Sequence, residues 1–253
     1  MIITSILPLE RLGLTYHREL IMAGSKESPS VVLVHGAWAD GSSWNDIIVP
    51  LLSKGLNVLA APIPLTSLSD DAVALDRALE RIDGPIVLVA HAYAGAVIGA
   101  NTNERVRALV FIAALAPDQG ETVADVFYRA KPHPRAPQLA PDEHGLIWMP
   151  QPGFAAAFAH HASPERAALF ATTQRPIALA CIQEKAQRPA WKVKPSWYLL
   201  AEEDRMISPA TQLFMAQRMG ARIRSEQVDH TPLVTAPAPV VDIILEAVES
   251  VAA

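Results

Sequence analysis

The chain has 253 residues, of which 51% are hydrophobic and 19% are charged. This length and apolar content predict one large folded domain with a sizeable core and exclude a disordered protein. The net charge of −5 and the lack of a Lys/Arg run exclude the basic surface that nucleic-acid binding requires, and the single cysteine, Cys181, excludes an intrachain disulfide or a cysteine metal cluster.

Short apolar runs bounded by Gly, Pro or Asp alternate along the chain with segments of helical periodicity. Alternation of this kind predicts βαβ crossovers, so the expected fold class is α/β, with a mainly parallel central sheet flanked by helices. Strands are expected at residues 12–22 (an edge strand or hairpin), 30–35, 56–61, 85–90, 107–113, 196–201 and 222–228. Helices are expected after a cap at Ser42 or Ser43, and at residues 69–82, 209–219 and 240–251.

The alternation fails over residues 117–190, where prolines are mixed with aromatic residues. A long irregular insertion inside a compact domain is usually functional. We interpret this stretch as a lid over the carboxyl edge of the sheet, within a single domain of residues 1–253. The N-terminus lacks the pattern of a signal peptide, and no apolar segment reaches the roughly 18 residues that span a bilayer. We therefore expect a cytoplasmic protein with no membrane partner.

Residues 85–100 read as a buried strand, a sharp turn of very small residues and a helix. This is the context of the nucleophile elbow, G-x-S-x-G, in which a strained turn exposes a catalytic serine. The five positions are Ala90-His91-Ala92-Tyr93-Ala94. Ala92 therefore occupies the serine position, and its methyl group cannot act as a nucleophile.

Polar residues follow four of the predicted strands at their carboxyl ends, where ligands bind in open α/β sheets. The four loops are residues 35–41, 91–93, 201–208 and 228–231. The second loop holds the nucleophile position, the third holds Asp204 and the fourth holds His230. The order nucleophile, acid, histidine is that of the serine hydrolases built on a nucleophile elbow.

Taken together in this order, these motifs resemble the alpha/beta hydrolase superfamily, and in particular small bacterial esterases and the plant methylesterase and hydroxynitrile lyase group. The resemblance runs along nearly the whole chain and implies an α/β-hydrolase fold. It also implies that the backbone N–H groups of Ala37 and Tyr93 form an oxyanion hole, that Asp204 orients His230, and that His230 is the general base. The resemblance rests on these motifs: His35-Gly36-Ala37-Trp38, Ser43-Trp44, the elbow, residues 203–207 and Asp229-His230.

The elbow departs from the family pattern at three positions, because Ala90, Ala92 and Ala94 stand where Gly, Ser and Gly are usual. Alanine is small enough for the close packing of strand and helix, but the covalent acyl-enzyme route is closed. Ala92 is either natural or an engineered replacement of serine. Three departures rather than one favour a natural elbow without serine.

Four residues are expected in the substrate pocket: His35, Trp38, His91 and Trp148. For the two histidines, shaping the loops by hydrogen bonding and contacting the ligand are both open. No metal is expected, because the histidines of the insertion have no compact ligand spacing. No cofactor is expected either, since the chain lacks the dinucleotide and nucleoside-triphosphate motifs. These insertion histidines are His133, His144, His160 and His161.

Three functions fit these residues. The first is an enzyme that uses the His230–Asp204 pair and an oxyanion hole on a small, largely apolar ester or carbonyl substrate, by lyase, cofactor-free oxygenase or water-attack chemistry. The second is a carboxylic ester hydrolase inactivated at position 92, which Ala92→Ser would restore. The third is a non-enzymatic protein that binds a small apolar ligand, which the retention of both Asp204 and His230 disfavours.

Overall fold

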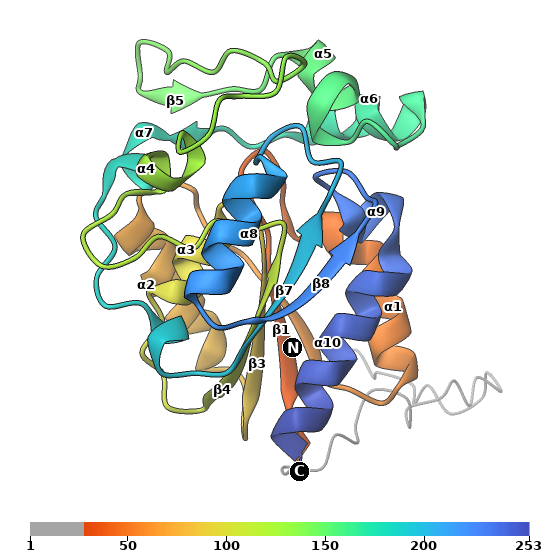
Figure 1. The fold of residues 1–253 in the computed structure, drawn as a ribbon. Coiled ribbons are helices and arrows are strands. Elements are labelled where there is room, and N and C mark those ends of the chain that lie inside the picture. The colour runs from red at the N-terminus through yellow and green to blue at the C-terminus, as the bar shows by residue number, and fades with distance from the viewer. Residues whose placement is uncertain (1–27, 253) are drawn as a thin grey trace, which may run out of the picture.

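Six strands form one parallel sheet in the computed structural model, which describes residues 28–252 (Figure 1). The predicted α/β architecture is confirmed, while the strand or hairpin expected at residues 12–22 lies outside the described range. In sheet order the strands are β2 (Val58–Ala61), β1 (Ser30–Val34), β3 (Ile86–His91), β4 (Val106–Ile112), β7 (Ser196–Ala201) and β8 (Arg222–Glu226).

The central strands are mostly apolar because both faces of the sheet are covered by helices. Along β3, Val87 and Val89 pack into one core cluster, whereas Leu88 and Ala90 pack into the other. The first face is covered by α1 (Asn45–Ser53) and α10 (Pro237–Ala252), and the second by α2 (Leu68–Leu79), α3 (Ala94–Gly99) and α8 (Pro209–Arg218) (Figure 1).

The direction in which strands are added to the sheet changes between β1 and β3. The chain places β2 on one side of β1 and then β3 on the other. At such a switch point the loops that follow the two strands diverge and leave a crevice at the carboxyl edge. The loops after β1 and β3 carry Ala37 and the elbow, so the topology brings these two predicted site elements together.

The expected cap at Ser42 or Ser43 is wrong. Asp40 has an extended backbone, and its carboxylate accepts from the Ser42 N–H at 2.8 Å, which caps the short 3-10 helix η2 (Gly41–Trp44). Ser43 instead donates its hydroxyl to the Asp40 carbonyl at 2.7 Å. Helix α1 then begins at Asn45 with no side-chain cap, as a continuation of η2.

Residues 117–190 fold into short elements that lie across the carboxyl ends of the strands (Figure 1). The insertion is held to the body by backbone hydrogen bonds, among them Trp38 N–H to Arg175 O at 3.1 Å and Ala178 N–H to Leu65 O at 2.9 Å. Its elements are α4 (Val123–Phe127), β5 (Leu146–Ile147), α5 (Gln151–Gly153), the π-helix η3 (Phe154–Phe158), α6 (Pro164–Thr173), β6 (Ile177–Ala178) and α7 (Leu179–Gln183).

Two further short helices are η4 (Ala190–Lys192) and α9 (Pro232–Thr235). Within residues 28–252, none of the helices has both the length and the apolar character that a membrane crossing needs.

Candidate active site

The turn between β3 and α3 has the strained backbone of a nucleophile elbow. Ala92 has a φ of +51°, a left-handed conformation that costs a residue with a Cβ roughly 1–2 kcal/mol. The strain is held by bonds on both sides, because the Ala92 carbonyl accepts from Gly95 N–H at 3.1 Å and from Leu115 N–H at 2.9 Å. Strain of this kind persists where the surroundings impose it, and it concentrates at functional sites.

Close packing explains why small residues stand at positions 90, 92 and 94 of the elbow. Ala90 and Ala94 are completely buried. A Cβ on Gly95 would lie 2.3 Å from the Leu115 carbonyl oxygen, and a Cβ on Gly36 would lie 3.0 Å from the Ala92 Cβ. The glycine that the fold needs most therefore stands one position after the motif, at Gly95, and alanine is accommodated at the three motif positions.

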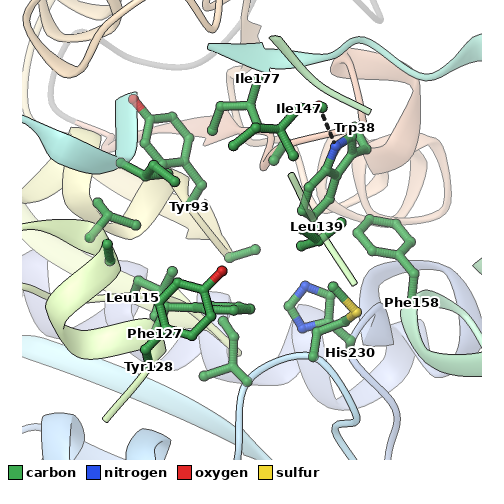
Figure 2. Close-up of a pocket in the computed structure, with 17 residues that line it drawn as sticks. Trp38, Tyr93, Leu115, Phe127, Tyr128, Leu139, Ile147, Phe158, Ile177 and His230 are labelled. Carbon is green, nitrogen blue, oxygen red and sulfur yellow. Dashed lines mark hydrogen bonds between the residues drawn. The ribbon is translucent and has the colours of Figure 1, made fainter. Parts of the chain in front are cut away.

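Asp204 and His230 form a buried pair at the carboxyl ends of β7 and β8. Asp204 Oδ2 lies 2.8 Å from His230 Nδ1, and both residues are at most 3% exposed. A carboxylate only accepts hydrogen bonds, so Nδ1 carries the proton of a neutral ring and Nε2 keeps its lone pair. His230 and Ala92 both line the same cavity, and the imidazole of His230 points into it (Figure 2).

The sequence did not indicate Gln212, which fixes the Asp204 carboxylate. Its side-chain NH₂ donates to Asp204 Oδ2 at 2.8 Å, while its carbonyl oxygen accepts from the Ala201 N–H at 3.0 Å. Asp204 Oδ1 accepts the backbone N–H groups of Met206 and Ile207 at 2.7 and 2.9 Å. Together with His230, four donors converge on this carboxylate and set the direction in which it faces the imidazole.

The cavity in front of His230 is apolar and has no charged side chain in its lining (Figure 2). Two of its polar groups are already engaged, because Trp38 Nε1 donates to the Ile147 carbonyl at 3.0 Å and the Tyr93 hydroxyl donates to Asp71 at 2.7 Å. The His230 imidazole and the hydroxyl of the half-exposed Tyr128 are the remaining polar side-chain groups of the lining that could contact a ligand. The lining consists of Ala37, Trp38, Ala92, Tyr93, Leu115, Val123, Ala124, Phe127, Tyr128, Leu139, Ile147, Phe158, Ile177, Ile182, Met206, Ile207 and His230.

Ala37 and Tyr93 lie in the same lining, next to Ala92 in the switch-point crevice. No described residue accepts a hydrogen bond from the backbone N–H of either. Unpaired N–H groups are rare in protein interiors and are available to an acceptor that enters the cavity. Two such donors suit a carbonyl oxygen that gains negative charge.

Tyr93 is anchored from below by a buried carboxyl group. Asp71 is completely buried, accepts from the Tyr93 hydroxyl, and also accepts from the Leu65 N–H at 2.7 Å. Burial raises the pKa of Asp71. The ring of Tyr93 thus forms a fixed wall of the pocket, and its backbone N–H is held in place with it.

Of the four residues predicted in the pocket, only Trp38 lines it. His35 and His91 are buried behind the loops, where His35 Nδ1 lies 3.0 Å from the Gly36 carbonyl and His91 Nε2 lies 2.7 Å from the His230 carbonyl. Burial lowers the pKa of both rings, for His91 to about 3, so these histidines are neutral and shape the loops. Trp148 is 47% exposed and lies outside the cavity lining, because its neighbour Ile147 takes the inward position.

The insertion contributes Phe158, which the sequence did not single out. Its ring makes edge contacts with His230 and Trp38, at centroid distances of 5.3 and 6.1 Å. Its carbonyl accepts from the Thr231 hydroxyl at 3.2 Å. Phe158 ends the π-helix η3, a form that often marks functional sites and has no simple sequence signature.

Comparisons with known proteins agree with this fold. The model of the family described as "Alpha/beta hydrolase family" matches residues 31–243. Among solved structures, similarity is found to polyneuridine aldehyde esterase (TM-score 0.71, 19% identity, covering 87% of this chain and 98% of the other). A pyrethroid hydrolase has a TM-score of 0.75 and 18% identity, over 88% of this chain and 98% of the other. A methylesterase from Arabidopsis has a TM-score of 0.71 and 16% identity, over 88% of this chain and 99% of the other. At these identities the likeness concerns the fold, and no curated protein sequence gives a match.

Proposed function

Because the chain belongs to the alpha/beta hydrolase family, we propose that it acts on a small, largely apolar ester or carbonyl compound, with His230 as the general base and Asp204 as its orienting acid. The names of the similar structures include an aldehyde esterase and a methylesterase, which supports an ester or carbonyl as the reacting group. The lack of charged groups in the cavity lining supports an uncharged substrate.

The observation that carries this proposal is the Asp204–His230 pair itself. Burying a carboxylate is costly unless it is fully hydrogen-bonded, and here four donors meet that requirement. A protein that only bound an apolar ligand would gain nothing from an imidazole oriented by such a carboxylate at the wall of its pocket. The pair therefore favours catalysis over binding alone.

Catalysis in the present chain would be non-covalent. With the substrate carbonyl oxygen on the N–H groups of Ala37 and Tyr93, His230 Nε2 would remove a proton from a water molecule or from the substrate. The two amides would stabilise the resulting oxyanion or enolate. The methyl group of Ala92 takes less room than a serine side chain and leaves space for the attacking water. In ester hydrolysis, water attacks the carbonyl carbon, the protonated His230 returns its proton to the departing alkoxide, and the acid and alcohol are released. Removal of a substrate proton gives lyase chemistry when a bond beside the resulting carbanion breaks, or oxygenase chemistry when dioxygen acts as the oxidant of that carbanion.

The test is turnover of p-nitrophenyl butyrate by the unmodified protein, His230→Ala and the control His144→Gln. His144 is an exposed histidine of the insertion and is absent from the cavity lining. We expect slow hydrolysis without a burst, reduced about 10²–10⁴-fold in H230A and unchanged in H144Q. Equal rates in H230A and the unmodified protein would rule out His230 as the base. Tight ligand binding without turnover of esters or carbonyl compounds would favour a binding protein.

A further inference from the structure

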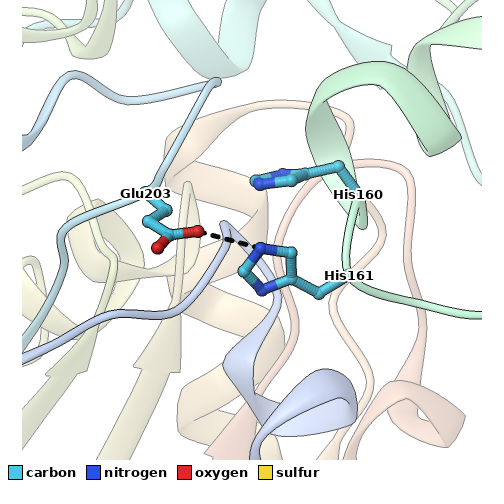
Figure 3. A group of neighbouring side chains, drawn as sticks. All are labelled: His160, His161 and Glu203. Carbon is cyan, nitrogen blue, oxygen red and sulfur yellow. Dashed lines mark ion pairs between the residues drawn. The ribbon is translucent and has the colours of Figure 1, made fainter.

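The insertion meets the loop after β7 at three side chains that metal ions favour as ligands (Figure 3). His160 and His161 come shortly after the π-helix η3, and Glu203 comes shortly after β7, directly before Asp204. The sequence shows the two histidines as an isolated pair. The fold adds a carboxylate from a distant segment, which the spacing of the histidines alone cannot indicate.

The three side chains have the separation of a metal site that needs only a small closure. His161 Nε2 lies 2.9 Å from Glu203 Oε2, and one ligand atom from each residue lies within 4.8 Å of the others. Ligands of a tetrahedral Zn²⁺ lie roughly 3.3 Å apart when the metal–ligand bonds are about 2.0–2.1 Å. The His160 and His161 rings already lie with centroids 4.3 Å apart, so only a small shift of the side chains is needed.

His160 supplies a second observation that points to a ligand. Both of its ring nitrogens are shielded from solvent, and neither makes a hydrogen bond of normal distance and angle with residues 28–252. A buried polar atom without a partner is destabilising, because it has lost its hydrogen bonds to water. Coordination of an ion would give one of these nitrogens a partner, while the exposed side chains of His161 and Glu203 leave a path for the ion to enter.

The backbone around the three ligands is fixed to the loop that carries His230. The His161 N–H donates to Asp229 Oδ2 at 2.9 Å, and the Glu203 N–H donates to the Val228 carbonyl at 3.1 Å. Two carboxylates, those of Glu203 and Asp229, and one guanidinium, that of Arg205, lie around the histidine pair, so the net charge there suits a cation. The Arg205 guanidinium donates to the Ala156 carbonyl.

We propose that His160, His161 and Glu203 bind one divalent transition-metal ion of the Zn²⁺ type. Two imidazoles and one carboxylate are a ligand set that zinc favours, with a water molecule in the fourth position. The ion would fasten the insertion to the loop that carries Asp204. None of the three ligands lines the apolar cavity, so this site is separate from the proposed catalytic one.

The test uses the full chain freed of metal with EDTA and then titrated with Co²⁺, followed by its visible absorption, and with Zn²⁺, followed by calorimetry and thermal melting. The variants are His160→Gln and Glu203→Gln. The matched control is His144→Gln, since His144 also lies beside a glutamate, Glu143 at 3.6 Å, but has no second histidine in reach. Melting in EDTA verifies that each variant is folded.

We expect one Co²⁺ per chain in the unmodified protein and in H144Q, and loss of this binding in H160Q and E203Q. Zn²⁺ at roughly 100 times its Kd should raise the melting temperature of the unmodified protein by about 5–10 °C. The proposal is overturned if the unmodified protein binds no metal, or if H160Q binds it equally well. Ester turnover is measured separately, so failure here leaves the role of His230 untouched.

Discussion

The surrounding structure holds the backbone of Ala92 in a strained conformation. The cost of this strain can be measured from the free energy of unfolding. Its φ of +51° disfavours any residue with a Cβ, whereas glycine adopts it freely. In Ala92→Gly the relief of strain, roughly 1–2 kcal/mol, exceeds the added entropy of the unfolded chain, about 0.4–1 kcal/mol. We expect A92G to raise the free energy of unfolding slightly, by up to about 1 kcal/mol in a urea titration. A clear decrease would mean that the Ala92 methyl group packs favourably in the elbow.

The hydrogen bonds of the Gln212 side chain lead to a second prediction. Gln212→Leu keeps much of the side-chain volume but removes its three polar contacts, so that one Asp204 oxygen and the Ile207 carbonyl each lose a donor and the Ala201 N–H is left unpaired. We expect a loss of about 1–3 kcal/mol of stability for each polar group left unsatisfied, with slower ester turnover because Asp204 is less well oriented. Urea unfolding and the hydrolysis assay measure the two effects. Unchanged values in both would show that Asp204 does not depend on this amide.

Helix α3 contains two glycines, Gly95 and Gly99, that differ in the space available for a side chain, which the sequence alone does not show. A Cβ on Gly95 would lie 2.3 Å from a backbone oxygen of Leu115, whereas a Cβ on Gly99 meets nothing closer than the Trp191 side chain at 3.9 Å. Gly95→Ala should disrupt the elbow and abolish cooperative folding or activity. Gly99→Ala should be neutral or stabilising by up to about 1 kcal/mol, since alanine favours helix. Similar melting temperatures for the two variants would contradict this packing.

Most strands of the parallel sheet could be predicted because each of these is marked by a short apolar run that neighbouring residues alone define. Apolar runs such as residues 85–90 appear as strands within a residue or two of their observed bounds, and Asp204 and His230 follow two such runs directly. The helix cap was misplaced because Asp40 and Ser43 compete for the same turn. The insertion was recognised as irregular, but its π-helix and the inward side chain of Ile147 depend on long-range packing.

The pocket and the proposed metal site involve residues whose partners lie far along the chain. His91 was predicted beside the substrate, yet its ring turns back to the His230 carbonyl. Gln212 is an ordinary helix residue until Asp204 is placed against it. Glu203 joins His160 and His161 only in the folded chain. Sequence patterns report periodicity and order, so contacts of this kind come from the tertiary structure.

For the molecule as a whole, the buried histidines predict how stability depends on pH. Burial lowers the pKa of His91 to about 3 and also lowers that of His35, whereas the unfolded chain binds these protons near pH 6.5. The unfolded state therefore takes up more protons as pH falls below 6.5, and stability that is fully present above that pH is lost progressively as pH falls, for His91 down to about pH 3. Each histidine contributes a slope of up to about 1.4 kcal/mol per pH unit.

His91→Gln tests this assignment, because glutamine retains a donor for the His230 carbonyl but does not titrate. We expect its free energy of unfolding, measured by urea titration between pH 7 and pH 5, to change less steeply than that of the unmodified protein. His144→Gln, at an exposed position, should leave the slope as it is. Equal slopes in H91Q and the unmodified protein would place the pH dependence elsewhere.

We propose that the elbow, the backbone N–H groups of Ala37 and Tyr93 and the Asp204–His230 pair form an esterase site that lacks only its nucleophile. The most direct measurement is the intact mass of Ala92→Ser after brief mixing with p-nitrophenyl butyrate. We expect a butyryl adduct on A92S, with a burst of p-nitrophenol, and no adduct on the unmodified protein or on A92S combined with His230→Ala. A folded A92S protein that gains no adduct and shows no burst would contradict it.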